Sequence, residues 1–423
     1  METGSPYRGF LLAVAVVVGL LGFVVGAPAL LGFSLAWAVL LATTFVAARR
    51  NLRGLEVLRR IPVSAFENEL VTVDVFLENH GRRAARLVAV SDVFGAGLAD
   101  RQAVLEVGPL PPQHGRPLAY RAFVARQWGV YTVGPLAVWA WDPLGLWHAA
   151  REVTLIQPFE VYPRVVEVAS LRGFGAHSAV APRDMTEAAA GQSLLFRGVR
   201  EFRAGDDVRR VHWPATAQRG VPMVREAERD VQPLFTLFVD LSRQGRAGIG
   251  KKSSLELLVR TGASLLWTAH RCGVASQVVG EGERSLLIPV GRGELHLAAA
   301  LHSLITARQT GTTPFLELVN AHRSHLPPGS TAILLVVATT ELDPGQLGPT
   351  LEALRAGGVR PLLFAIDAFS LPPVERPPVP AATARIHRRE LQAKLSELQV
   401  PVAILDPAED LLAELQRPDL FAP

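Results

Sequence analysis

The stretch Leu-Phe-Thr-Leu-Phe-Val-Asp-Leu-Ser, residues 234–242, decides the fold of the C-terminal half of this chain. Residues 234–240 read as a continuous strand, because an apolar run without strict alternation is typical of a strand that is buried on both faces. A helix is expected directly downstream, over residues 253–271, since its leucines recur on one helical face and Ser253 with Glu256 forms a capping-box pattern. A buried strand followed by an amphipathic helix predicts an α/β domain.

The same alternation continues to the C-terminus. Further strands are expected at 274–280, 284–290, 333–338, 361–366 and 401–405, and helices at 295–307, 347–357, 382–398 and the end of the chain. This pattern predicts a mainly parallel, doubly wound sheet. Ligands bind such sheets at the carboxyl ends of the strands, which directs attention to Asp240.

Upstream, residues 55–165 have the pattern of β structure. Val71, Val73, Val75 and Leu77 alternate with more polar residues, and later strands are expected around 118–124, 130–133, 136–141 and 152–162. Short strands with Gly and Pro between them predict a β-sandwich-like domain. Residues 166–195, rich in Ala, Gly and Ser, are expected to form a long loop. We therefore divide the chain into segments 1–50, 51–165, 166–232 and 233–423.

The N-terminus contains no charged residue from Gly9 to Ala48. This run is about twice the ~20 apolar residues that one spanning helix needs, and Gly26–Pro28 interrupts it. It predicts a transmembrane hairpin of two helices, 9–25 and 29–48, in contact with membrane lipid. Basic residues flank both ends, so the bulk of the chain is expected in the cytoplasm, anchored to the cell membrane.

A secretory signal peptide is the alternative, with cleavage after Ala27 or Ala29. The second apolar segment argues against it, because cleavage would leave that segment as a free N-terminal helix. The single cysteine, Cys272, excludes a disulfide within the chain and is typical of a reducing compartment. The net charge of +4 is spread out, so no nucleic-acid partner is expected.

The residues after the first α/β strand resemble the metal-binding loop of von Willebrand factor A domains, in which Asp-x-Ser-x-Ser holds a divalent cation. Asp240 and Ser242 match, Gln244 replaces the second serine, and Thr312 or Thr313 could supply the family's threonine. Such hard oxygen ligands suit Mg²⁺. Thr339-Thr340-Glu341 stands where the family has its aspartate. Of two interpretations, we favour a degenerate loop that only reverses the chain, and an occupied Mg²⁺ site is the alternative. We expect no other cofactor.

The same loop partly matches a phosphate-binding pattern through Gly245, Gly250 and Lys251, but position 252 is Lys where Ser or Thr is required. A Mg²⁺- or nucleotide-dependent enzyme, a hydrolase using residues 240–252, is the alternative function. We expect no enzyme, because the sequence has no His-Glu-x-x-His, Gly-x-Ser-x-Gly or Cys-x-x-Cys pattern.

Residues 200–213 form a charged segment between two aromatic residues, Phe202 and Trp213. The residues expected to form a partner surface here are Arg203, Gly205, Asp206, Asp207, Arg209, Arg210 and Trp213. Gly205 permits a turn, and Asp206–Arg209 and Asp207–Arg210 have the spacing of helical ion pairs. Trp213 is expected to be buried and to dock the segment on the α/β domain. The alternative is a solvated, salt-bridged connector.

This Gly-Asp-Asp segment closely resembles the signature of the domain of unknown function 58 family of bacterial proteins. Asp142-Pro143-Leu144-Gly145-Leu146 matches a second family stretch, whereas Pro214 departs from the lysine that often follows the tryptophan. The resemblance implies a membrane hairpin, a β region and a von Willebrand factor A-like domain. It also implies a scaffold or adaptor that binds protein partners, among them a MoxR-type AAA ATPase.

Overall fold

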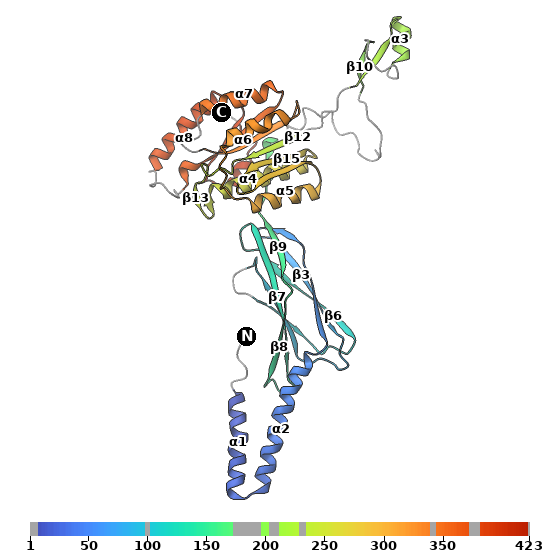
Figure 1. Cartoon of the computed structure of the whole chain (residues 1–423), viewed down its shortest axis with the longest axis vertical. Coiled ribbons are helices and arrows are strands. Elements are labelled where there is room, and N and C mark those ends of the chain that lie inside the picture. Colours follow the sequence, from blue (N-terminus) through green and yellow to red (C-terminus); the bar gives the residue numbers. More distant parts are fainter. Residues whose placement is uncertain are drawn as a thin grey trace. The chain divides into compact units, whose positions relative to one another are not determined.

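The computed structural model describes residues 7–97, 102–171, 196–202, 211–227, 234–338, 344–371 and 381–421. The chain divides into two compact units, Met1–Arg164 and Val165–Pro423, and each is described by itself (Figure 1). Residues 203–210, which contain most of the Gly-Asp-Asp segment, lie outside the described residues.

The N-terminal unit begins with two apolar helices, α1 (Tyr7–Val25) and α2 (Pro28–Asn51), which run side by side (Figure 1). The Ser34 hydroxyl donates to the Ala15 carbonyl at 2.7 Å, and the Trp37 indole donates to the Leu11 carbonyl at 3.2 Å. Among the described residues, α2 alone is long and apolar enough to cross a membrane; the apolar part of α1, Gly9–Val25, is shorter.

Two sheets follow. The first has the order β1-β3-β6, and the second has the order β2-β9-β7-β4-β5 with β8 paired to β7. Their bounds are β1 Leu55–Arg60, β2 Ser64–Phe66, β3 Leu70–Asn79, β4 Val88–Phe94, β5 Gln102–Val107, β6 His114–Phe123, β7 Gly129–Trp141, β8 His148–Val153 and β9 Gln157–Tyr162. All pairs are antiparallel except β2–β9. Buried and exposed residues alternate along β3, and its buried valines join residues of β4, β7 and β9 in one core.

A buried polar cluster lies within that core. Arg59 of β1 forms an ion pair with Asp92 of β4 at 2.7 Å, and both side chains are fully buried. The Tyr120 hydroxyl of β6 donates to the second Asp92 oxygen at 2.7 Å, and Arg59 also donates to two backbone carbonyls. These bonds join the two sheets and satisfy charges that would be costly to bury alone.

The C-terminal unit contains a six-stranded sheet with the order β16-β15-β12-β17-β18-β19. Its strands are β12 Leu234–Val239, β15 Ala275–Glu281, β16 Ser285–Gly291, β17 Thr331–Ala338, β18 Arg360–Asp367 and β19 Val402–Leu405. Neighbours are parallel except β15 and β16. The strand order reverses between β12 and β17, which is the switch point where ligands bind in doubly wound sheets.

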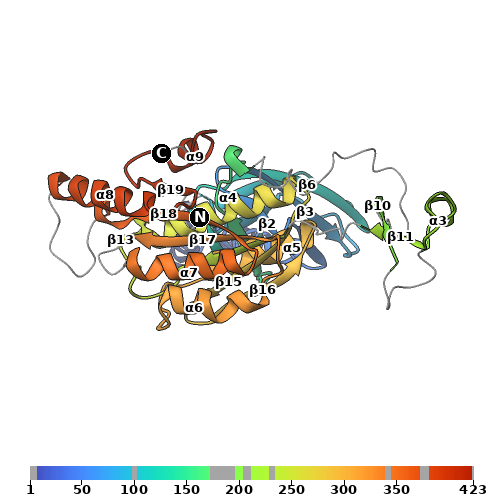
Figure 2. The same ribbon diagram turned by 90° about the horizontal axis from the view of Figure 1, so that it is seen from above.

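Helices cover both faces of this sheet (Figure 2). They are α4 Ser254–Arg271, α5 Glu294–Thr306, α6 Phe315–His322, α7 Pro344–Ala356, α8 Ala381–Ser396 and α9 Leu411–Leu415. Helices α6, α7 and α8 share a core with Phe238, while Gly262 of α4 faces Leu237 and Leu304 on the opposite side. Successive residues of β12 therefore point to opposite, equally buried faces, as its apolar run predicts.

Most elements of this unit follow the sequence prediction. The Ser253 hydroxyl accepts a hydrogen bond from the Glu256 amide at 3.2 Å, which confirms the expected cap of α4. Helix α6 of this unit was not predicted. In the N-terminal unit, residues 130–133 and 136–141 belong to one strand, β7, and residues 152–162 divide between β8 and β9. A small antiparallel pair, β10 (Phe196–Glu201) with β11 (Met223–Ala227), and the short helix α3 (Trp213–Arg219) precede the sheet.

Candidate functional site

Asp240 lies at the carboxyl end of β12, at the switch point of the sheet. Its side chain is buried, with 3% of its surface exposed, and Ser242 beside it is 5% exposed. The strand ends here. Leu241 is buried, and Arg243 is the first exposed residue of the loop that follows. The strand order places this loop at the carboxyl end of β12, beside the switch point where ligands bind in other doubly wound sheets.

The Asp240 carboxylate accepts hydrogen bonds from within the protein on both oxygens. Oδ1 accepts from the Ser242 hydroxyl at 2.6 Å and from the Ser242 amide at 3.1 Å, and Oδ2 accepts from the Val337 amide of β17 at 3.2 Å. Burial raises the pKa of the Asp240 carboxyl above its usual range, although these hydrogen bonds act to lower it. The carboxylate therefore holds the loop against the neighbouring strand.

A second loop packs tightly on the first. The Gly311 amide donates to the Leu241 carbonyl at 2.9 Å, and the Arg243 amide donates to the Gly311 carbonyl at 2.8 Å. A Cβ at Gly311 would lie 2.1 Å from the Glu281 carbonyl oxygen, so only glycine fits this close approach. Gln309, which is buried, receives a hydrogen bond from Ser254 at 2.8 Å. These contacts hold the loop after β12 in place.

A cavity of about 360 Å³ opens beside Asp240. Asp240, Ser242, Val336 and Val337 line it from the sheet end, and its other lining residues are Gln244, Gly245, Pro314, Phe315, Leu316 and Gln346. Gln244, Pro314 and Gln346 are exposed, whereas Phe315 is buried. We call this cavity, with these lining residues, the Asp240 cleft. Its lining is about equally polar and apolar, and its exposed polar side chains are the neutral amides of Gln244 and Gln346.

Among the described residues, few side chains of the Asp240 cleft could hold a divalent cation. A single carboxylate lines it, and the Ser242 hydroxyl donates to that carboxylate. Thr312 is exposed, and neither Thr312 nor Thr313 lines the cleft. Within the described ranges, no group of three or more His, Cys, Asp or Glu side chains could hold a metal ion. Thr339, Thr340 and Glu341 lie outside the described residues.

The Gly250-Lys251 stretch does not form a phosphate cradle. It is the turn of a two-residue hairpin, in which β13 (Gly248–Ile249) pairs with β14 (Lys252–Ser253). The following helix is capped by Ser253, which satisfies the Glu256 amide. A phosphate-binding loop would present its backbone amides to the ligand at this helix N-terminus.

The Gly-Asp-Asp segment gives a correction. Arg203, Gly205, Asp206, Asp207, Arg209 and Arg210 lie outside the described residues, so their expected ion pairs stay predictions. The expectation that Trp213 is buried is wrong: its side chain is 69% exposed at the start of α3. The helix is capped by His212, whose Nδ1 accepts from the Ala215 amide at 3.2 Å.

Sequence reasoning missed a second charged site at the same edge. Asp367 ends β18 and is fully buried; Arg388 of α8 donates to it at 2.6 Å and also pairs with Asp406, which follows β19. Burial opposes ionisation of Asp406, but hydrogen bonds from Arg388 and from the Ala408 amide, together with the Arg388 charge, lower its pKa. Burial raises the pKa of nearby Glu414 to about 7. The sequence pattern that singled out Asp240, an acidic residue at the end of an apolar strand, is also present at Asp367 and could have predicted this site.

The fold, with Asp240 and Ser242 at its switch point, defines a von Willebrand factor A-like α/β domain. Residues 198–370 match the model of the family described as "Protein of unknown function DUF58", so the family resemblance of the Gly-Asp-Asp segment is confirmed. No curated protein matches the chain.

Two solved structures are similar in part. One is the VWA domain of SpRpn10, at 12% identity, covering 44% of this chain and 93% of that one with a TM-score of 0.28. The other is the CARDB domain of the PF1109 protein in complex with di-metal ions from Pyrococcus furiosus. It has 18% identity, 26% and 91% coverage and a TM-score of 0.18. Likeness at these TM-scores carries no argument about either domain.

Proposed function

We propose that this protein is a membrane-anchored scaffold whose von Willebrand factor A-like domain binds a protein partner at the Asp240 cleft. The observation that carries the proposal is the chemistry of that cleft. Its one ionisable group is buried and hydrogen-bonded within the protein, while its mouth presents Gln244, Gln346 and the half-buried Leu316. Apolar side chains beside neutral polar groups suit recognition of a polypeptide.

The N-terminal unit supplies the anchor in this proposal. Helices α1 and α2 expose many large apolar side chains, among them Phe23 at 78% and Leu35 at 68%. Exposed apolar area on that scale is costly in water and is stable in lipid. We propose that both helices form a spanning hairpin, that the two sheets form a β-sandwich, and that the α/β domain lies in the cytoplasm.

The Gly-Asp-Asp segment is proposed to extend the partner surface. The exposed Trp213 supports this role, because tryptophan is enriched among the residues that dominate binding energy at interfaces. A MoxR-type AAA ATPase, which the family resemblance implies, is the first partner to test. A Mg²⁺- or nucleotide-dependent hydrolase remains the alternative, and the hairpin at Lys251 gives it no support.

Co-purification from solubilised membranes tests the cleft. Gln346→Arg places a charge at its mouth, and Gln392→Arg is the matched control, because Gln392 is also an exposed helical glutamine but does not line the cleft. We expect Gln346→Arg to reduce recovery of the partner roughly tenfold, since an unpaired charge in an interface costs more than about 1.4 kcal/mol. Equal recovery with both variants, or no co-purifying protein, would refute a scaffold acting through this cleft.

Topology is tested separately. A reporter fused after Pro423 is expected to be active in the cytoplasm and silent outside it, because basic residues flank the hairpin. A reporter active only outside the cell would support the signal-peptide alternative. It would also remove an AAA ATPase from consideration, because that partner needs cytosolic ATP.

A further inference from the structure

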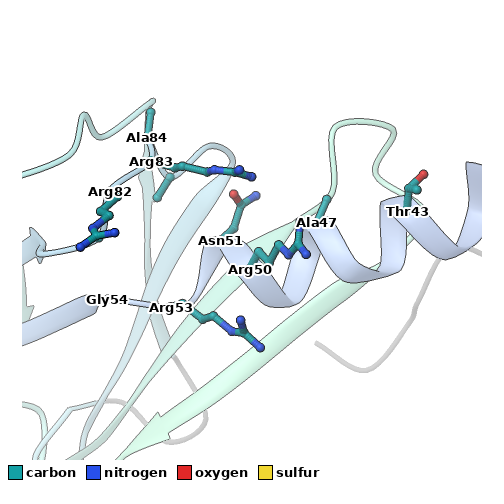
Figure 3. Close-up of a pocket in the computed structure, with 11 residues that line it drawn as sticks. Thr43, Ala47, Arg50, Asn51, Arg53, Gly54, Arg82, Arg83 and Ala84 are labelled. Atoms are coloured by element: carbon teal, nitrogen blue, oxygen red, sulfur yellow. The ribbon is translucent and has the colours of Figure 1, made fainter.

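A basic pocket lies where α2 meets the β domain. It has a volume of about 660 Å³ and is lined by two segments, the last turns of α2 and the loop between β3 and β4. Four arginines line it, Arg50 and Arg53 from the first segment and Arg82 and Arg83 from the second (Figure 3). All four are exposed. We call these four residues with Thr43, Asn51 and the glycines beside them the arginine pocket.

The backbone of the arginine pocket is fixed from both sides. A Cβ at Gly54 would lie 2.7 Å from the Gly81 amide nitrogen, so the two segments touch where neither has a side chain. Asn79, which is 1% exposed, donates to the Arg83 carbonyl at 2.9 Å and accepts from the Gly81 amide at 2.9 Å. Asn51 donates to the Arg86 carbonyl at 3.2 Å. The positive side chains are therefore presented from a preformed site.

The arginine pocket holds positive charge without compensation. None of its lining residues, all of which the structure describes, is Asp or Glu. In the described part of the chain, none of the four arginines forms an ion pair. Stabilisation of the α2 C-terminus explains Arg50, since cations there offset the helix dipole. It does not explain Arg82 and Arg83, which come from a separate loop.

The surroundings give the depth at which the pocket would lie in a bilayer. The uncharged part of α2 ends at Ala48, just before Arg49 and Arg50, and Phe45 packs edge-on against Trp147 at 5.4 Å. The Arg49 guanidinium lies 4.6 Å from the centre of the Phe45 ring. The Asp142 carboxylate accepts hydrogen bonds from the Leu144 and Trp147 amides and so closes a short loop. Leu144 on this loop is 57% exposed. Aromatic and basic residues at the end of an apolar helix mark the headgroup region.

We propose that the arginine pocket binds the phosphate groups of anionic phospholipids in the leaflet that faces the β domain. This inference rests on the proposed membrane anchor. Guanidinium groups match phosphate oxygens in bidentate geometry, and two segments that approach from different directions can hold one headgroup between them. The bound headgroup would fix the orientation of the β domain on the bilayer surface.

The test uses the full chain in nanodiscs that contain phosphatidylcholine with a minor fraction of phosphatidylglycerol, and measures enrichment of the anionic lipid around the protein. The variant Arg82→Gln/Arg83→Gln is compared with Arg116→Gln/Arg121→Gln, which removes the same charge from exposed positions on β6. We expect the pocket variant to lose roughly 30-fold in preference for phosphatidylglycerol, from two arginines at about 1 kcal/mol each. The control should stay within about twofold.

Each other outcome has one meaning. Equal loss in both variants would show a diffuse charge effect and overturn the proposal. Displacement of the lipid by millimolar inorganic phosphate would show a site for free anions and overturn the assignment to lipid. Carbonate extraction of native membranes tests the anchor by itself: wild-type protein released by carbonate would refute the anchor, whatever the lipid preference in nanodiscs.

Discussion

Removal of the Asp240 carboxylate should destabilise the α/β domain, and should do so without any dependence on metal. Asp240→Ala deletes the acceptor of three hydrogen bonds, one from the Ser242 hydroxyl and two from the backbone amides of Ser242 and Val337. Asp240 is the one carboxylate that lines the cleft, so this substitution removes all of the negative charge there. Asp240→Ala therefore distinguishes two roles of this carboxylate, structural hydrogen bonding and metal binding.

The magnitude follows from the groups left without partners. Each buried amide that loses its acceptor costs about 1–3 kcal/mol, and the adjoining cleft lets water recover part of that cost. We therefore expect a loss of about 2–4 kcal/mol, which for a domain of this size lowers the melting temperature by roughly 4–15 °C. Ser242→Ala removes the hydroxyl alone and should cost about 1 kcal/mol.

Thermal unfolding of the purified protein, with millimolar Mg²⁺ or with EDTA, provides the assay. A ligand at about 100 times its dissociation constant stabilises a protein by ~2.7 kcal/mol, so an occupied Mg²⁺ site would raise the wild-type melting temperature by several degrees. We expect wild type and Asp240→Ala to differ equally in both buffers. A Mg²⁺-dependent increase that disappears in Asp240→Ala would refute the structural reading of this carboxylate.

Three further predictions concern other parts of the molecule. Asp92→Ala leaves Arg59 buried without its partner and should cost about 3–5 kcal/mol in denaturant unfolding of the β domain, with a smaller loss for Tyr120→Phe; equal small losses would contradict the buried pair. Because burial raises the pKa of Glu414 to about 7, its stabilising contribution is complete below its unfolded pKa and is lost as the pH rises through 7. Glu414→Gln should raise the stability at pH ~8 by about 1–3 kcal/mol and flatten that part of the pH profile; an unchanged profile would count against it. Trp213→Ala should change stability by less than about 0.5 kcal/mol but weaken partner binding, whereas a large loss of stability would indicate that Trp213 is buried.

Local signals in the sequence predicted much of the fold. The apolar run of β12 and the Ser253 cap of α4 each depend on neighbours within a few residues, and both are present in the structure. The position of Asp240 at the carboxyl end of a sheet strand followed from the same alternation of strands and helices, whereas the switch point beside it did not. Such features can be predicted because period and capping act over one element.

The rest depends on contacts between distant residues. The Val337 amide reaches Asp240 across 97 positions of sequence, and the Asp92 partner of Arg59 is 33 positions away. Neither pairing leaves a local pattern, so the cleft and the buried ion pair could not be read from the chain. Trp213 shows the opposite error, because a large aromatic residue was taken as evidence of burial. Tryptophan is also common on exposed binding surfaces.

The central claim is that the Asp240 cleft binds a protein. The most direct measurement places a photo-crosslinking amino acid at position 346, at the mouth of the cleft, and at position 392 as the control, in cells that express the full chain. We predict one discrete protein adduct from position 346, unchanged by EDTA in permeabilised cells, and none from position 392. No adduct from position 346, or an adduct that disappears with EDTA, would contradict a protein-binding cleft that works without a metal.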